Sequence, residues 1–255
     1  MKANYHTHTW RCGHAHGADR EFVETAIARG LTLLGFSDHV PMPFPDGHES
    51  PFRVPIRELD GYFTSLLSLK EEYRGEIDLR IGFEAEYYPD LLPAMLDLLR
   101  PYPVDFFLLG QHYNDSTEKP WNFRPTEDPG RLKQYTDRIL EALSTGLFSA
   151  AAHPDLLTFT GSPSFYQAEM RRLCEGAKAL DIPLEINLLG LSEKRGYPRD
   201  FFWETAASVG NRIYLGCDAH QPDSVANPEH LAEAYAYAAR FGITPEDRIE
   251  LKKPF

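Results

Sequence analysis

Short apolar runs alternate with longer amphipathic segments along most of the chain, a pattern typical of repeated βα units with parallel strands. The apolar runs predict seven strands, at residues 3–8, 31–37, 77–86, 104–112, 147–153, 182–188 and 212–218. Apolar residues spaced three and four apart predict helices that end near Gly30 or cover about 56–74, 90–100, 129–145, 164–180, 199–209 and 228–241. The pattern predicts an α/β fold, and a barrel is the simplest form for this length.

Two irregular stretches interrupt the alternation. Residues 40–55 contain five prolines, and residues 113–127 lack a helix or strand pattern. Loops of this length are commonly lids or binding loops. No internal repeat or change of composition marks a second domain, so residues 1–255 are expected to form one domain.

Composition and charge narrow the class of protein. The 255 residues are 42% hydrophobic and 25% charged, as in an ordinary globular enzyme. A net charge of -12 disfavours a protein that binds long nucleic acid through its phosphates. No apolar run has the length of a membrane span or a signal peptide, so a cytoplasmic protein is expected. Cys12, Cys174 and Cys217 form no CxxC pair and are expected to be reduced, structural thiols.

Ionisable residues gather where the predicted strands end. In chain order these residues are His6 and His8, Asp38 and His39, Glu84 and Glu86, His112, His153, Glu185 and Asn187, and finally Asp218 and His220. The carboxyl ends of parallel barrel strands form one mouth, and the active site of such barrels is assembled there. The sequence therefore predicts one polar site built from all seven strands.

The alternating pair His6 and His8 indicates metal chemistry. The strand period of two would send both side chains to one face, the barrel interior, where unpaired imidazoles are costly. Divalent metals would satisfy them, with Glu84 and Asp218 adding negative charge. A single buried histidine at a strand end is more often a hydrogen-bonded core residue, but such a residue on every strand is not explained in that way. Three further histidines are expected at the surface or behind the site: His16, His48 and His230.

Six segments of the chain resemble, in order and spacing, the motifs of the polymerase-and-histidinol-phosphatase (PHP) superfamily of metal-dependent phosphoesterases. They are YHTHTWRCGHAHG, GFSDHVPMP, GFEAEY, GQHY, AHPDL and GCDAH. The resemblance covers nearly the whole chain. It implies a distorted seven-stranded (β/α) barrel of the TIM-barrel type, with three metal ions in its mouth.

The resemblance also implies how nine ligands would be shared among the three divalent ions. The first ion would take His6, His8, Glu84 and Asp218; the second Glu84 as a bridge, His112 and His153; the third His14, His39 and His220. Manganese, iron and zinc all accept such nitrogen and oxygen ligands, so the metal stays open.

Within the superfamily, the segments CGHA, FSDHVPMP and EKRGYP resemble the branch that hydrolyses L-histidinol phosphate in histidine biosynthesis. The expected substrate is thus a small phosphate monoester, attacked by a hydroxide that bridges two metals. Because the imidazole ligands must be neutral, activity is expected to fall below about pH 6.

Further residues are candidates for substrate contacts and for orienting the ligands. Arg195 first and Arg11 second are expected to bind the phosphate, since a guanidinium matches two phosphate oxygens. Asp38 and Glu86 would orient neighbouring ligands, and Asn187 would contact either a ligand or the substrate. Aromatic candidates for a wall around the leaving group are Tyr87, Tyr88, Trp121 and Phe123.

Three alternatives stay open at this point. One is a phosphodiesterase or phosphatase that acts on another small substrate such as a nucleotide. A metal-dependent amidohydrolase also begins with HxH, but it usually has eight strands and a bridging lysine that no strand end here offers. A non-catalytic metal-binding module is the third. The sequence gives no signal for an oligomeric state.

Overall fold

Seven parallel strands pair in their sequence order in the computed structural model, which describes residues 1–255. They are β1 (Ala3–Asn4), β2 (Leu33–His39), β3 (Asp78–Ala85), β4 (Phe106–Leu109), β5 (Ala150–Ala151), β6 (Leu184–Asn187) and β7 (Ile213–Gly216). Just beyond β1 and β7, Thr7 and Ala219 form a parallel bridge, and the His8 amide donates to the Ala219 carbonyl at 2.9 Å. This bridge brings the two edges of the sheet together, and the predicted seven-stranded barrel is confirmed.

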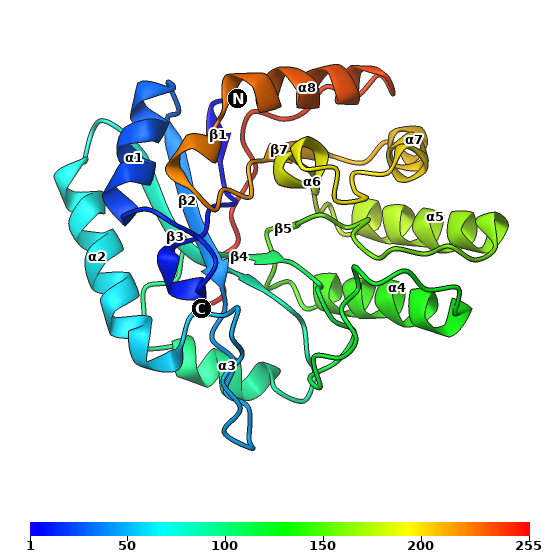
Figure 1. The fold of residues 1–255 in the computed structure, drawn as a ribbon, viewed down its shortest axis with the longest axis horizontal. Coiled ribbons are helices and arrows are strands. Elements are labelled where there is room, and N and C mark those ends of the chain that lie inside the picture. Colours follow the sequence, from blue (N-terminus) through cyan, green and yellow to red (C-terminus); the bar gives the residue numbers. More distant parts are fainter.

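The helices lie around the outside of the strands, as Figure 1 shows. They are α1 (Asp19–Ala28), α2 (Leu59–Glu72), α3 (Leu92–Leu99), α4 (Pro129–Ser144), α5 (Pro163–Ala179), α6 (Leu188–Ser192), α7 (Asp200–Val209) and α8 (Pro228–Ala239). Capping chemistry marks where several begin: the side chains of Asp128, Ser162 and Asn227 accept from amides in the first turns of α4, α5 and α8. In each of these helices the residue after the cap is a proline. A proline costs nothing there, because an N–H at the first helical position has no hydrogen-bond partner within the helix. No helix is both long and apolar enough to cross a bilayer.

The strand period decides which side chains face the barrel interior. Leu79, Ile81 and Phe83 of β3 belong to the main apolar core of 59 buried residues, which lies between the sheet and the helices. Successive side chains of a strand point to opposite faces, so Glu84 points inward. The same alternation on β6 places Ile186 in the core and Glu185 inside the barrel.

The barrel interior is apolar at the amino-terminal end of the strands. A separate cluster of nine buried residues fills it: Ala3, Tyr5, Leu33, Phe106, Leu108, Ala150, Ala152, Tyr214 and Ile249. The Ile249 amide donates to the Tyr5 hydroxyl at 3.1 Å, so the C-terminal segment closes this end. In Figure 1 this segment is the red trace across the middle. The buried histidines and carboxylates that follow the strands lie at the opposite, carboxyl-terminal end of the barrel.

Several element boundaries differ from those predicted. The 3–8 strand is cut to two residues, because beyond Asn4 the chain is held to its neighbours by the single bridge at Thr7. His6 and His8 therefore lie after β1 rather than within it. Gly30 lies one residue beyond Arg29, which caps α1. The short helix α6 and the 3-10 turns at 10–12 and 222–224 were not predicted, since segments this short carry no periodic signal. The helix predicted at about 56–74 begins as a 3-10 turn at 56–58 and continues as α2.

Candidate metal centre

The carboxylate of Glu84, at the end of β3, is the point on which the imidazoles converge. It is 1% exposed. The nearest imidazole nitrogens lie at 2.7 Å for His153, 3.1 Å for His39, 3.5 Å for His6, 3.6 Å for His112 and 3.7 Å for His8. These five histidines come from the ends of three strands, β2, β4 and β5, and from the segment after β1, so the predicted convergence on one mouth is observed.

Asp218 supplies a second carboxylate, which contacts the same two histidines, His6 and His8. Its Oδ1 lies 3.0 Å from His8 Nε2, 3.5 Å from His6 Nε2 and 3.3 Å from His220 Nδ1. Asp218 and His153 both have positive φ, at 49° and 29°. Such backbone costs energy for residues with a side chain and gathers at functional sites.

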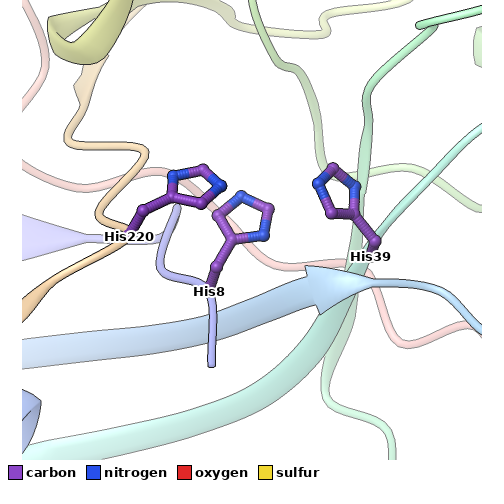
Figure 2. A group of neighbouring side chains, drawn as sticks. All are labelled: His8, His39 and His220. Atoms are coloured by element: carbon purple, nitrogen blue, oxygen red, sulfur yellow. The ribbon is translucent and has the colours of Figure 1, made fainter. Parts of the chain in front are cut away.

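A third group of imidazoles lies toward the mouth. Figure 2 shows His8, His39 and His220 turned toward one another, and their donor atoms all lie within 4.8 Å. The His8 and His220 rings stack, with centroids 4.1 Å apart. His14 is exposed, and its ring centroid lies 4.8 Å from that of His220 and 5.3 Å from that of His39. The three histidines predicted for the third ion are therefore neighbours, but His8 rather than His14 completes the tightest group.

The donor atoms of this centre fit a divalent metal. Five buried atoms of the candidate ligands have no hydrogen-bond partner: His6 Nε2, His8 Nε2, His39 Nδ1, Glu84 Oε2 and His153 Nδ1. Burying polar atoms without partners is costly, and natural structures rarely leave several together. Compact triads recur around Glu84, including one with His6 and His8 and another with His39 and His112. Imidazole and carboxylate donors at this spacing suit zinc, manganese or iron.

Three carboxylates behind the imidazoles hold their other ring nitrogens. Glu185 Oε1 lies 2.8 Å from His6 Nδ1, and Glu86 Oε1 lies 2.7 Å from His112 Nδ1. Asp38 Oδ1 lies 3.4 Å from His8 Nδ1. Such contacts keep the proton on Nδ1 and direct the Nε2 lone pair into the site. The orienting contacts predicted for Asp38 and Glu86 are present in the structure.

Asn187 joins two of the acidic groups. Its amide nitrogen donates to Glu185 Oε2 at 3.0 Å and to Asp218 Oδ2 at 3.1 Å. Its Oδ1 accepts from the Gly190 amide at 2.8 Å, which starts helix α6. Of the two roles left open for Asn187, this geometry matches contact with a candidate ligand.

Burial and mutual contact divide the protonation behaviour of the centre. Burial opposes a charge on His6, but the carboxylates of Glu185, Asp218 and Glu84 outweigh it and raise the pKa of His6 well above its usual value. Burial, with His8 next to it, lowers the pKa of His220 to about 3. His39 is shifted in the same direction for the same two reasons, so its pKa lies well below the ordinary value. The imidazoles of His39 and His220 are therefore neutral near pH 7 and can bind a cation without first losing a proton.

A pocket of about 380 Å³ opens above the imidazoles. Arg195 and Tyr197 stand on its wall with the candidate ligands His112 and Asp218. The Arg195 guanidinium is 40% exposed and pairs with Glu193 at 2.7 Å. The predicted phosphate contact of Arg195 is therefore within reach of the mouth.

Arg11 is not brought to this pocket. Its Nη1 donates to both carboxylate oxygens of Asp19, at 3.0 and 2.9 Å, and its guanidinium lies over the Trp10 ring. The pair is buried, so the guanidinium already has the bidentate partner that a phosphate would provide. Proximity to the HxH motif in sequence does not place Arg11 beside it in space.

A family model for the PHP domain matches residues 4–188. This chain belongs to the PHP-domain family. A probable histidinol-phosphatase of Deinococcus radiodurans is 29% identical over 227 residues, which cover 86% of each chain. A probable histidinol-phosphatase of Schizosaccharomyces pombe is 26% identical and is covered over 90% of its length, against 98% of this chain.

Solved structures agree on the fold of this PHP domain. The histidinol phosphate phosphatase of Lactococcus lactis, complexed with zinc, L-histidinol and phosphate, superposes with a TM-score of 0.73. It is 19% identical, with 96% of this chain and 95% of that chain covered. A putative histidinol phosphatase of Listeria monocytogenes gives 0.70 at 20% identity, over 89% of this chain and 98% of its own. The predicted family, barrel and phosphatase class are confirmed.

Sequence reasoning missed several residues that shape the PHP centre. Tyr197 is buried on the pocket wall, with its ring centroid 5.7 Å from that of His153. His16, expected away from the strand ends, also lines the pocket. Gly110 lies so close to Glu84 that a Cβ there would sit 1.8 Å from Glu84 Oε1. A glycine directly after an apolar strand was the available signal for this close approach.

Two of the four aromatic candidates lie on the pocket wall, and two do not. Trp121 and Phe123 line the pocket above the imidazoles. Tyr87 instead points to Glu141, and Tyr88 packs beside Arg53, so neither lies on the pocket wall. The three cysteines are free and buried, as predicted.

Proposed function

We propose that this PHP protein hydrolyses a small phosphate monoester, L-histidinol phosphate, to L-histidinol and phosphate. The observation that carries the proposal is the buried Glu84 carboxylate with five imidazoles around it, at the floor of a pocket whose wall holds Arg195. Relatives that this chain matches over 86% and 90% of their length are named as probable histidinol-phosphatases. The Lactococcus lactis protein of the same fold was crystallised with zinc, L-histidinol and phosphate.

Three divalent ions, of zinc, manganese or iron, are proposed as cofactors. The proposed ligands are His6, His8, His14, His39, Glu84, His112, His153, Asp218 and His220, with Glu84 shared between two ions. Such ions acidify a water molecule to a hydroxide nucleophile and neutralise the oxygens of the transferring phosphoryl group. Glu185, Asp38 and Glu86 keep the imidazoles oriented for this task.

Arg195 is the proposed phosphate contact of the chain itself. Its Nε and Nη2 now both contact Glu193 Oε2, and two phosphate oxygens would replace this contact by the bidentate pairing that Arg geometry favours. Asn187 would hold Asp218 in place from behind. Nothing in this scheme uses Arg11.

The leaving group would lie in an adjoining cleft of about 810 Å³ between the 40–55 and 113–127 loops. Asp46 and Asp90 face this cleft together with Phe52 and Trp121. Carboxylates and aromatic rings together favour a cationic, ring-bearing alcohol such as L-histidinol.

The test is phosphate release by protein loaded with zinc or manganese. L-histidinol phosphate would be compared with p-nitrophenyl phosphate, its bis-ester and a panel of nucleotides. We expect kcat/KM of at least about 10⁴ M⁻¹s⁻¹ for L-histidinol phosphate alone. Preference for the bis-ester or a nucleotide would replace the proposal by the phosphodiesterase alternative, and no turnover of any ester despite full metal loading would favour a non-catalytic module.

The metal-free protein should have its maximum stability near pH 6.5. The carboxylates raise the pKa of His6, His8 and His112 against the effect of burial, so their stabilisation is complete below about pH 6.5 and is lost as pH rises. Burial lowers the pKa of His39 and His220, so their neutral forms contribute stability that is lost as pH falls below about 6.5.

Thermal unfolding from pH 5 to pH 9 measures this balance. In a chelating buffer, Tm should pass through a maximum near pH 6.5. With excess zinc the maximum should move to higher pH, because ligands must be deprotonated to bind the ion. A metal-free Tm that continues to rise above pH 7.5 would contradict the prediction.

A further inference from the structure

Arg53, in the 40–55 loop, lies buried between two carboxylates from different parts of the chain. Its Nη1 donates to Glu86 Oε2 at 2.5 Å. Its Nη2 and Nε donate to Glu118 Oε1 at 2.5 and 2.9 Å. The residue is 3% exposed. A planar guanidinium can serve two carboxylates together because its five donors point in fixed directions, which a lysine cannot reproduce.

Glu86 carries this contact to the metal centre. Its second oxygen, Oε1, lies 2.7 Å from His112 Nδ1, and His112 Nε2 lies 3.6 Å from Glu84 Oε1. Glu86 is buried, and Arg53 is the cationic side chain paired with it. The Glu86 carboxylate is held between Arg53 and His112, so removing Arg53 would leave it free to move. Such a movement alters the acceptor that fixes the His112 ring.

Glu118 carries the contact in the other direction, into the 113–127 loop. Its Oε2 accepts from the Ser50 hydroxyl at 2.8 Å, and its side chain is 7% exposed. Its backbone has a φ of 51°, a conformation that glycine adopts at lower cost. The carboxylate that ties the two loops together therefore stands where the backbone alone would favour glycine.

The same two loops pack against the candidate ligands. The Phe52 ring, next to Arg53, has its centroid 5.2 Å from that of His39 and 6.3 Å from that of His112. Trp121 of the 113–127 loop has its centroid 5.2 Å from that of Phe52. Movement of either loop would thus shift the aromatic rings that contact the imidazoles. The Arg53–Glu118 pair is the charged contact that joins the two loops.

We propose that Arg53 is a positioning residue of the metal centre. It fixes the orientation of His112 through Glu86. Because Arg53 also pairs with Glu118, this orientation depends on the position of the 113–127 loop. The inference rests on the proposed function only where activity is measured, since metal binding can be followed without a substrate.

The test measures zinc affinity by competition with a chelator for the unaltered protein and for Arg53→Met, Arg53→Lys and Glu118→Gln. We expect Arg53→Met to weaken the binding of one ion by about 10- to 100-fold, the usual effect of removing a partner behind a metal-bound histidine. Glu118→Gln should act in the same direction by a smaller factor, and Arg53→Lys should restore part of the affinity. The visible absorption of the cobalt-substituted protein should change in parallel, and kcat should fall more than KM changes.

Two control variants separate positioning from stability. Arg57→Met removes an exposed arginine that pairs with Glu49 at 2.8 Å in the same region. Arg212→Met removes a partly buried arginine that pairs with Glu246 at the amino-terminal side of β7. Both should bind zinc as the unaltered protein does, even if the second unfolds at a lower temperature.

Unchanged zinc affinity and an unchanged cobalt spectrum in Arg53→Lys and Glu118→Gln would overturn the inference, whatever happens to Tm. These two milder variants decide the matter if Arg53→Met fails to fold. Altered metal affinity in a protein that hydrolyses no phosphate ester would support the positioning role and overturn the proposed function alone.

Discussion

Glu84→Gln should lower kcat/KM for phosphate ester hydrolysis by at least about 10³-fold, equal to about 4 kcal/mol of transition-state stabilisation. The Glu84 carboxylate is the one acidic group that faces five imidazoles, with His153 at 2.7 Å and His39 at 3.1 Å. An amide keeps the shape but loses the charge and one acceptor. Bound metal should fall with activity, as measured by elemental analysis after gel filtration.

Glu204→Gln is the matched control for Glu84. It makes the same chemical change at an exposed position of α7, so activity and metal content should not change. If Glu84→Gln bound a full set of ions and turned over substrate within tenfold of the unaltered protein, Glu84 would not be the shared ligand.

Gly110→Ala should have the second largest effect, although glycine carries no chemistry. A Cβ at this position would lie 1.8 Å from Glu84 Oε1 and 2.4 Å from its carboxyl carbon. The Glu84 carboxylate would have to leave the space where it meets His153 and His112. We expect activity to fall by about 10²- to 10³-fold. The clash should also cost about 1–3 kcal/mol of stability.

The size of the Glu84 side chain offers a check on this explanation. In Gly110→Ala, the further change Glu84→Asp shortens the carboxylate and should restore part of the metal binding that the alanine removes. Gly61→Ala is the control on α2, where the nearest atom to a Cβ is Glu58 Oε2 at 3.7 Å, and it should leave activity unchanged. Full activity in Gly110→Ala would show that Glu84 is not confined by this contact.

The alternation of apolar and polar residues predicted most of the fold. The strands β2 and β3 lie within two residues of their predicted ends, whereas β4 begins two residues later and ends three residues earlier than predicted. The length of β1 was overestimated: residues 6–8 continue the alternating sequence pattern of the strand but do not continue its pairing with β2. Pairing is decided by a neighbouring backbone rather than by the residues of the strand itself.

Eight of the nine candidate ligands were also predictable, because ionisable residues after the strands all fall at the same end of a barrel. His14 followed only from the resemblance to the PHP motifs. Contacts between distant segments were not predictable. Arg11 and Arg195 are both basic residues near motifs, yet Arg11 turns to Asp19 while Arg195 reaches the pocket. Local spacing does not report which partner a long side chain meets.

The sequence by itself determined the seven βα units, the polar end of the barrel and the residue types of a metal-dependent phosphatase, because strand period and motif order are local properties. Only the tertiary structure decided that Glu84 stands at the centre of the imidazoles and that Gly110 makes room for it. It also decided that Arg53 reaches His112 through Glu86. These contacts join residues more than 20 positions apart, and their geometry follows from how the strands and loops pack.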